Sequence, residues 1–209
     1  MIFRSIPSQL SRENKKFLYK VVKKGARARE YEDALQWLVD AGIVHKIYRS
    51  TSPSLPLIAY DDISAFKIYL ADVGLLRKLC QLSPRAFGEK NRLFTEFKGA
   101  LTENFVLQSL ICQSDLTPRY WSQNNPSYEV DFLVQKENDI YPVEVKAESN
   151  TRATSLKKFK ELFSDKVKLR IRYSLDNLKL DGDVLNIPLF MIDYTDSLIK
   201  LALNKLGQS

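Results

Sequence analysis

The sequence has few of the residues that bind soft metals or act as nucleophiles. Its 209 residues include one histidine, His45, and two cysteines, Cys80 and Cys112, which do not form a CxxC pair. A single imidazole excludes zinc enzymes that use several histidine ligands, and two isolated thiols do not indicate a disulfide framework. We therefore expect two reduced thiols, and we interpret His45 as an ordinary strand residue.

Phosphate-binding loops and long apolar segments are also missing. Neither GxxxxGK[ST] nor GxGxxG occurs, so no motif supports binding of ATP or a dinucleotide. No stretch approaches the roughly 20 apolar residues that cross a bilayer. The first residues, MIFRSIPSQLSRENKK, lack the apolar run of a signal peptide. These absences lead us to expect a cytoplasmic protein.

What the sequence does contain is typical of a globular protein with an excess of positive charge. Hydrophobic residues make up 44% of the chain, which is enough for a packed core. The formal net charge of +7 favours association with a polyanion such as nucleic acid, although an excess of lysine also keeps proteins in solution. Both interpretations remain open on charge alone.

The N-terminal part has the pattern of a winged helix. Apolar residues at helical spacing predict a helix over 13–24 that ends at Gly25 and a second over 30–41 that ends at Gly42. The segments IVHKIY and FKIYLAD then read as two strands. The basic residues placed where such a module would contact a DNA backbone are Lys23, Lys24, Arg27 and Arg29. The alternative is a small packing domain with a solvated lysine face.

The remainder of the chain predicts a second domain. Proline, glycine and charge without a clear period suggest a linker, so we predict a winged-helix-like domain over 1–85, a linker over 86–94 and a second domain over 95–209. Its predicted elements are a helix over 95–111, strands over 119–123, 128–134 and 140–147, a helix over 153–163 and a strand over 167–173. The order αβββαβ predicts an α/β or α+β fold with a mixed sheet.

Charged residues interrupt two of these strands, EVDFLV and YPVEVK. If the turn between them is centred on Glu137 and Asn138, Asp131 lies opposite Glu144, and two carboxylates about 5 Å apart repel unless positive charge lies between them. With the carbonyl of Val145 they form an all-oxygen site that suits Mg²⁺ or Mn²⁺. Lys146 would orient an attacking water or stabilise developing negative charge.

A further acid precedes these strands, on the helix GALTENFVLQSLI. Glu103 shares the inward stripe of that helix with Ala100 and Leu107, and a buried carboxylate needs a partner. We expect Glu103 to approach the same cation. The alternative for the strand residues is a solvated cross-strand charge ladder on an ordinary hairpin.

These residues resemble the PD-(D/E)xK nuclease superfamily, whose core is αβββαβ and whose site is an acid on the second strand followed by ExK on the third. The closer likeness is to the C-terminal region of a prokaryotic family of AAA-type ATPases, in which a winged helix precedes a nuclease-like domain of unknown function. The similar stretches are LVDAGIVHKIY, FKIYLADVGLL, KGALTENFVLQSL, EVDFLV and PVEVKA.

The resemblance implies a restriction-endonuclease-like core in which Asp131 and Glu144 bind metal, Lys146 is catalytic and Glu103 is the helix carboxylate. Val130 stands where the superfamily motif has proline. The expected function is Mg²⁺- or Mn²⁺-dependent hydrolysis of DNA, less readily of RNA. The alternative is a non-catalytic module that binds nucleic acid or docks on an ATPase domain outside this sequence.

Basic residues after the motif add a candidate phosphate-binding surface. Lys157 and Lys158 lie in the following helix, and the segment KVKLRIRY alternates basic with apolar residues. Such residues could hold a phosphate backbone with an affinity that falls as salt rises. Equally, they could form the solvated side of a helix and of an edge strand, where lysine opposes aggregation.

Overall fold

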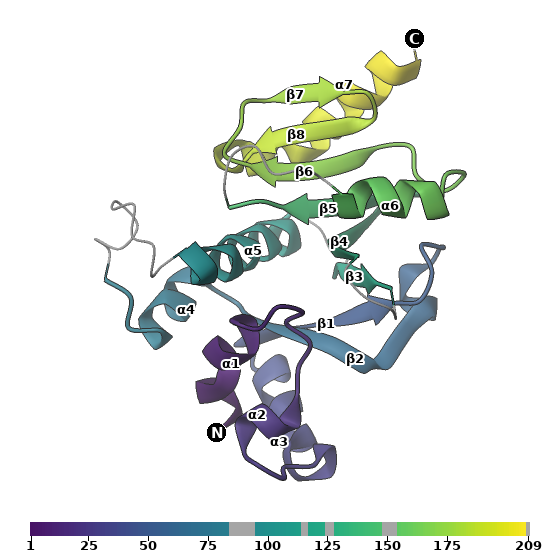
Figure 1. Ribbon diagram of the computed structural model, residues 1–209. Helices are drawn as coiled ribbons and strands as arrows, with labels where there is room; N and C mark the ends of the chain where they lie inside the picture. Colours follow the sequence, from purple (N-terminus) through teal and green to yellow (C-terminus); the bar gives the residue numbers. More distant parts are fainter. Residues whose placement is uncertain (84–94, 114–116, 124–127, 148–153, 208–209) are drawn as a thin grey trace. The chain divides into compact units, whose positions relative to one another are not determined.

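A computed structural model describes the chain except for residues 84–94, 114–116, 124–127, 148–153 and 208–209 (Figure 1). The predicted linker, 86–94, lies outside the described residues. Within the described part, no helix combines the length and apolarity that crossing a membrane requires. The chain divides into two compact units, the first made of 1–48 and 63–108 and the second of 49–62 and 109–209.

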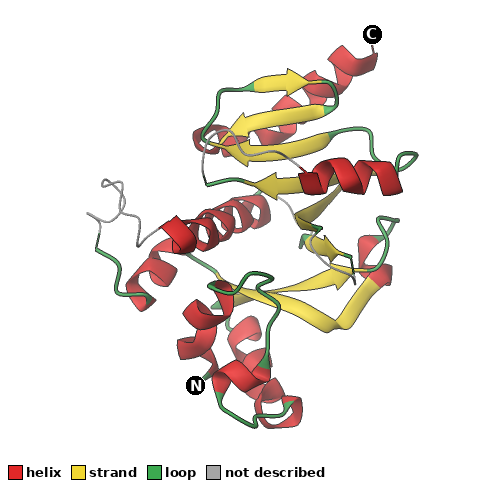
Figure 2. Cartoon of the chain, viewed as in Figure 1, coloured by secondary structure: helices red, strands yellow, loops and turns green. Residues whose placement is uncertain are grey.

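The first unit is mainly helical, with two strands that each continue into the second unit (Figure 2). Its elements in chain order are α1 (Ile2–Leu10), α2 (Tyr19–Val22), α3 (Ala28–Asp40), β1 (Val44–Ser50), β2 (Asp61–Leu70), α4 (Val73–Leu79) and most of α5 (Thr95–Cys112). Helix α3 agrees with the predicted second helix. Gly42 follows it at φ +66°, a conformation that glycine adopts without strain.

The predicted helix over 13–24 is wrong in its first half. Leu18 is extended, at φ −129° and ψ 119°, and only Tyr19–Val22 is helical. The backbone N–H of Phe17 donates to the carbonyl of Phe66 at 2.8 Å, and the two rings stack with centroids 5.3 Å apart. Pairing with β2 therefore overrides the helical pattern at Phe17.

Helix α1 was not predicted. Its buried residues Ile2, Ile6 and Leu10 recur every fourth position, which is the spacing of one helix face. Pro7 lies inside the helix. Because proline lacks a backbone N–H donor, its presence in the sequence disfavours a predicted helix here. The apolar spacing was the signal that could have identified this helix.

The second unit is built around a mixed sheet. Its elements are η1 (Leu57–Tyr60), β3 (Arg119–Ser122), β4 (Glu129–Lys136), β5 (Asp139–Val145), α6 (Thr154–Leu162), β6 (Arg170–Ser174), β7 (Lys179–Asp181), β8 (Val184–Pro188), η4 (Leu189–Tyr194) and α7 (Thr195–Gly207). The hydrogen-bonded strand order is β2-β1-β3-β4-β5-β6-β8-β7. Strands β3, β4 and β5 pair antiparallel, whereas β5, β6 and β8 pair parallel.

The predicted fold class, α/β with a mixed sheet, is therefore confirmed, and α5 through β6 follow the predicted order αβββαβ. The interpretation of the segment KVKLRIRY as an edge strand was wrong. Strand β6 is not an edge strand, because it lies between β5 and β8. The short edge strand β7, which pairs antiparallel with β8, was not predicted.

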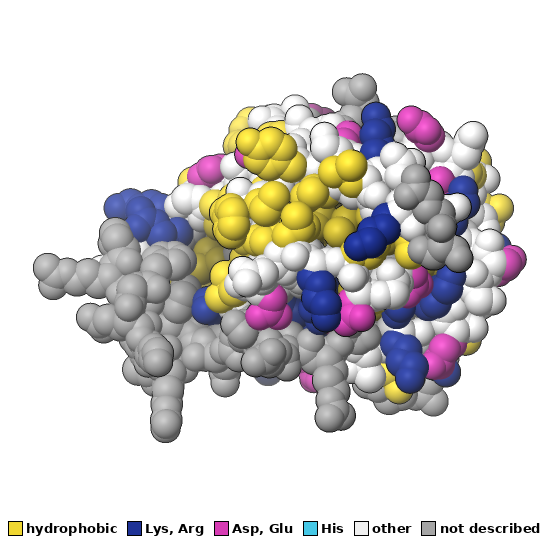
Figure 3. All heavy atoms as spheres, turned by 90° about the horizontal axis from the view of Figure 1, so that it is seen from above, with side chains coloured by type: hydrophobic (Ala, Val, Ile, Leu, Met, Phe, Trp, Pro, Cys, Tyr) yellow, Lys and Arg dark blue, Asp and Glu magenta, His cyan; other side chains and the backbone are white. Residues whose placement is uncertain are grey.

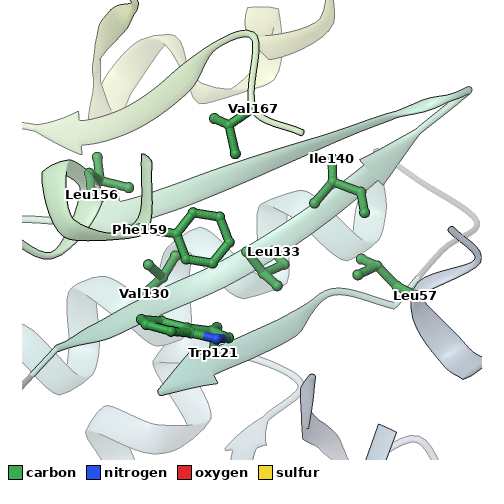
Figure 4. Packing of buried hydrophobic residues seen from close by; sticks show 8 residues of the cluster. All are labelled: Leu57, Trp121, Val130, Leu133, Ile140, Leu156, Phe159 and Val167. Atoms are coloured by element: carbon green, nitrogen blue, oxygen red, sulfur yellow. The ribbon is translucent and has the colours of Figure 1, made fainter. Parts of the chain in front are cut away.

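Helix α6 packs on the sheet of the second unit through aromatic residues (Figure 4). The Phe159 ring points toward Val130, Leu133 and Trp121, and it meets the Trp121 ring edge-on with centroids 5.1 Å apart. The buried cluster comprises Leu57, Trp121, Val130, Leu133, Ile140, Leu156, Phe159 and Val167. Because apolar burial supplies most of the stabilisation, this cluster fixes α6 over β4 and β5.

We expect Phe159→Ala to destabilise the protein by about 3 to 5 kcal/mol, because it removes a fully buried ring and leaves a cavity. Leu162→Ala on the same helix is the matched control, since Leu162 is 44% exposed. Urea unfolding of the full chain measures both. Equal losses from the two substitutions would contradict the assigned core.

Candidate functional site

The β4–β5 hairpin positions the predicted acids. Its pairing runs from Lys136 opposite Asp139 to Phe132 opposite Val143, and the turn contains Glu137 at φ +51°. This is the register that the sequence predicts from a turn centred on Glu137 and Asn138. Counted from the turn, the last regular pair is Phe132 with Val143, so the regular pairing stops one residue short of Asp131.

Asp131 lies where β4 is irregular. The four residues of β4 from Val130 to Leu133 span the same stretch of β3 as the three from Arg119 to Trp121, so β4 contains one extra residue there. Simple alternation along β4 therefore fails at this point, and Val130 and Leu133 join the same cluster. Bulges of this kind redirect side chains and are common next to active sites.

The Asp131 side chain bonds to the backbone of the neighbouring strand. Its Oδ2 accepts a hydrogen bond from the Val145 N–H at 2.7 Å. This bond brings the Asp131 carboxylate to the end of β5, where Glu144 is the residue before Val145. Asp131 and Glu144 are thus held at the same end of the hairpin, through a side-chain contact with the backbone.

Glu144 is buried, with 3% of its surface exposed. Its Oε1 pairs with Lys146 Nζ at 2.6 Å, whereas its buried Oε2 has no hydrogen-bond partner among the described residues. A solvated charge ladder does not fit a carboxylate that is removed from water. A buried oxygen without a partner is costly, and a bound ligand would satisfy it.

A divalent cation fits this donor set. The predicted ligands, from Asp131, Glu144 and the carbonyl of Val145, are all oxygens, as Mg²⁺ and Mn²⁺ prefer. Among the described residues, no three His, Cys, Asp or Glu side chains gather as a metal site. The protein would therefore supply two carboxylates and a carbonyl, and water or a phosphate would supply the other ligands.

Glu103 lies in the first unit and has its own partners there. Its Oε1 pairs with Lys15 Nζ, and its Oε2 accepts a hydrogen bond from the Tyr69 hydroxyl at 3.1 Å. Burial alone would raise the pKa of Glu103, but the charges of Lys15 and the fully buried Lys67 and the two hydrogen bonds lower it overall. Glu103 therefore has the partners that a buried carboxylate needs. A role of Glu103 at the cation stays a prediction.

The sequence pattern does not reveal these partners of Glu103 directly. Lys67 stands among apolar residues in the segment FKIYL, and a lysine inside a buried strand is a signal that it faces an acid. Lys15 was hidden by the helix wrongly predicted over 13–24. Its backbone has φ +49°, which is not the conformation of a residue in a helix.

The four predicted nucleic-acid residues of the first unit lie around one connection. Lys23 follows α2, Lys24 comes next, Arg27 caps the start of α3 and Arg29 is in its first turn; all are exposed. In the second unit, Lys157 on α6 is exposed. Its neighbour Lys158 is half-buried and pairs with Glu161 at 3.4 Å.

Apolar side chains are also exposed. Figure 3 shows hydrophobic side chains gathered over the face that it presents. In the second unit the large exposed apolar residues include Leu175, Leu178, Phe190, Tyr194 and Leu201, and Phe190 is 84% exposed. Gathered apolar surface is typical of protein interaction sites.

Two families match this chain, each over less than half of it. Residues 98–190 match a domain of unknown function (DUF4143), and residues 1–86 match a second domain of unknown function (DUF8612). Neither description names an activity. The predicted domain limits stay a prediction.

Two curated proteins are similar to the chain over 122 residues at 32% identity: the uncharacterized proteins Mb2031c of Mycobacterium bovis and Rv2008c of Mycobacterium tuberculosis. The matched stretch is 58% of this chain and 25% of either relative, so the chain spans about a quarter of their length. No solved structure matches the chain.

We expect Glu103→Gln to cost about 3 kcal/mol of stability at neutral pH, because it leaves the buried Lys67 and Lys15 without their carboxylate. The folded-state pKa is lowered, so the stabilisation is complete above the unfolded pKa of about 4.3 and is lost as the pH falls through the folded value. The measured difference from wild type should shrink accordingly in urea unfolding at decreasing pH.

The control for this substitution is Glu161→Gln, which removes an exposed acid paired with Lys158. Its effect on the free energy of unfolding should be small at every pH. A Glu103→Gln difference that stays constant through the acid range would show that the ionised carboxylate does not stabilise the fold.

Proposed function

We propose that the second unit is an Mg²⁺- or Mn²⁺-dependent nuclease that hydrolyses phosphodiester bonds in DNA and, less readily, in RNA. The observation that carries the proposal is the buried Oε2 of Glu144, which has no hydrogen-bond partner in the described part of the chain and lies beside Lys146 at the same hairpin end as Asp131. The order αβββαβ and the ExK spacing of Glu144 and Lys146 resemble the PD-(D/E)xK core and add support.

Each residue has a distinct task in this proposal. Asp131 and Glu144, with the carbonyl of Val145, would hold the cation, which would supply Lewis-acid activation of the phosphate and of an attacking water. Lys146 donates a hydrogen bond toward the attacking water or a phosphate oxygen. The water oxygen forms a bond to phosphorus and its proton passes to solvent, while the bond from phosphorus to the leaving oxygen breaks and that oxygen takes a proton from solvent.

Lys146 has a second task because its partner Glu144 is buried. Its ammonium already neutralises one oxygen of Glu144, and its side chain is 27% exposed, so it can also face a substrate. A cation at the site would share the Glu144 carboxylate with Lys146. The competition would release the ammonium toward the phosphate when both ligands are present.

A second candidate function is a non-catalytic module that binds nucleic acid or docks on an AAA-type ATPase, as the resemblance to such ATPases implies. The exposed basic residues at the α2–α3 connection favour nucleic-acid binding. The exposed apolar residues of the second unit favour docking on an ATPase. The curated relatives are about four times longer than the matched stretch, which leaves room for further domains.

We expect calorimetric titration with Mn²⁺ to show binding to the wild-type protein that is abolished by Asp131→Ala and by Glu144→Gln, because each removes one of two carboxylate ligands. The same substitutions should abolish cleavage of linear and circular DNA. Asp139→Asn is the control, since Asp139 lies at the other end of β5 and pairs with Lys168 at 2.8 Å.

Retained cleavage in both site variants would remove Asp131 and Glu144 from the mechanism. Absence of Mn²⁺ and Mg²⁺ binding by the wild type would refute the metal-dependent nuclease and leave the binding module. Far-ultraviolet circular dichroism of each variant separates a lost ligand from a lost fold.

We expect charge reversal of Lys23, Lys24, Arg27 and Arg29 to weaken DNA binding and to flatten its salt dependence, by a slope of up to about 4 if each contacts a phosphate. Fluorescence anisotropy with labelled duplex DNA across a salt series measures both. Reversal of Lys157, exposed on α6, tests whether the effect belongs to the α2–α3 connection. Unchanged binding in the fourfold variant would exclude this surface.

A further inference from the structure

Helix α3 of the first unit buries very little of its surface. Of its 13 residues, from Ala28 to Asp40, only Leu35 is buried. Trp37 is 66% exposed, although tryptophan is on average one of the more buried residues of globular proteins. Most helices in proteins are stabilised by packing of an apolar face. Helix α3 therefore presents apolar surface that its own unit does not cover.

A cleft lies between α3 and α1, two helices that pack against each other (Figure 1). Its volume is about 330 Å³. The side chains that line it are all apolar: Met1, Ile2, Phe3, Ala34, Trp37 and Leu38. The three from α3 are spaced three and four positions apart, so they share one side of the helix. Apolar surface gathered in this way is typical of a site that binds another protein.

Acidic residues flank the apolar side of α3. Glu30 lies four positions before Ala34, and Asp33 lies four positions before Trp37, so each acid is one helical turn from an apolar residue of the cleft. Asp40 lies three positions after Trp37, and all three acids are exposed. The helix contains four acidic residues and one basic residue, a net charge of −3, whereas the whole chain carries +7.

This local charge discriminates between possible occupants of the cleft. Helix α1 has one charged side chain, Arg4, so the two helices together stay acidic. Acidic side chains repel the phosphates of nucleic acids and of anionic lipids. A second copy of the chain, docked by twofold symmetry, would place the same acids against one another, which like-charge repulsion opposes. A protein segment with basic residues beside its apolar ones complements the cleft in both respects.

The shape of the cleft favours a helical segment. Two packed helices leave a groove into which a third amphipathic helix can lay its apolar face. At 1.5 Å per residue, the 13 residues of α3 extend over about 20 Å, which matches three to four turns of a partner helix. Trp37 is the expected main contact, because tryptophan is enriched among the residues that dominate interface energies.

We propose that the cleft between α1 and α3 docks a basic amphipathic helix of a partner protein. Aliphatic side chains of that helix contact Trp37, and its lysines or arginines lie beside Glu30 and Asp33. The inference goes beyond the proposed nuclease function and does not depend on it. It assigns the body of α3 to protein binding and leaves the basic α2–α3 connection to the DNA backbone that it is predicted to contact.

The test uses a synthetic peptide as the probe. The fluorescein-labelled peptide has about 14 residues, enough for four helical turns, with leucine at helical spacing and lysine elsewhere. The reference peptide has glutamate in place of each lysine. Anisotropy with the full chain at low salt should show binding of the lysine peptide and none of the glutamate peptide.

Tryptophan emission locates the bound peptide. The chain has two tryptophans, and the second, Trp121, is 5% exposed and supplies a constant signal. An unlabelled lysine peptide should shift the emission of the wild type to shorter wavelengths, because docking removes the Trp37 ring from water. Trp37→Phe should abolish the shift.

Two substitutions on α3 test the two kinds of contact. We expect Trp37→Ala to weaken peptide binding about thirtyfold, as for a residue that dominates an interface. Glu30→Lys should weaken it about tenfold, because it replaces attraction with repulsion. Glu32→Lys is the matched control and should bind like wild type, since Glu32 faces α2, where burial and the charge of Glu32 raise the pKa of Tyr19. Circular dichroism confirms that each variant is folded.

Each outcome decides the inference. Absence of binding of the lysine peptide to the wild type, or equal binding of both peptides, would overturn it. Equal affinities of Glu30→Lys and Glu32→Lys would show that the acids beside the cleft do not select the partner. A wild-type dimer in sedimentation that Trp37→Ala dissociates would assign the cleft to a second copy, and loss of duplex DNA binding in Trp37→Ala would assign it to nucleic acid. Failure of Mn²⁺ binding or cleavage would overturn the nuclease alone.

Discussion

The burial of Glu144 is the constraint on which the rest of the candidate site depends. A carboxylate with 3% of its surface exposed must be neutralised, and Lys146 satisfies only one of its oxygens. The hairpin fixes that position, since Glu144 follows directly on the regular pairing of β4 with β5. The irregularity in β4 then brings Asp131 to the same end. Fold and site are thus determined by the same few residues.

The first unit solves the same electrostatic problem within the protein. Glu103 is as buried as Glu144, yet both of its oxygens have partners, in Lys15 and Tyr69, and Lys67 adds a further positive charge. A carboxylate with its partners built in is suited to stabilising a fold. One whose second oxygen has no partner among the residues that the structure describes is suited to binding a ligand, and this difference distinguishes the two buried acids.

The sequence was informative where a pattern is local. The turn between EVDFLV and YPVEVK predicts the hairpin register, and Gly42 predicts the end of α3, because short-range geometry decides both. It failed where distant residues decide. Phe17 is extended because it pairs with Phe66, and Lys15 meets Glu103 across 88 positions of sequence. The bulge at Asp131 depends on the register with β3, which no pattern within β4 reveals.

The same limit applies to Arg172 and its neighbours. In the segment KVKLRIRY the basic residues look equivalent, but the sheet gives each a different partner: Asp139 for Lys168, Asp183 for Arg170 and Asn186 for Arg172. Two of these partners are acids, and the third is an amide. The strand order β5-β6-β8 places Arg172 beside Glu144. The partner of each basic residue therefore depends on its position in the sheet, which the alternation of basic and apolar residues along the segment does not reveal.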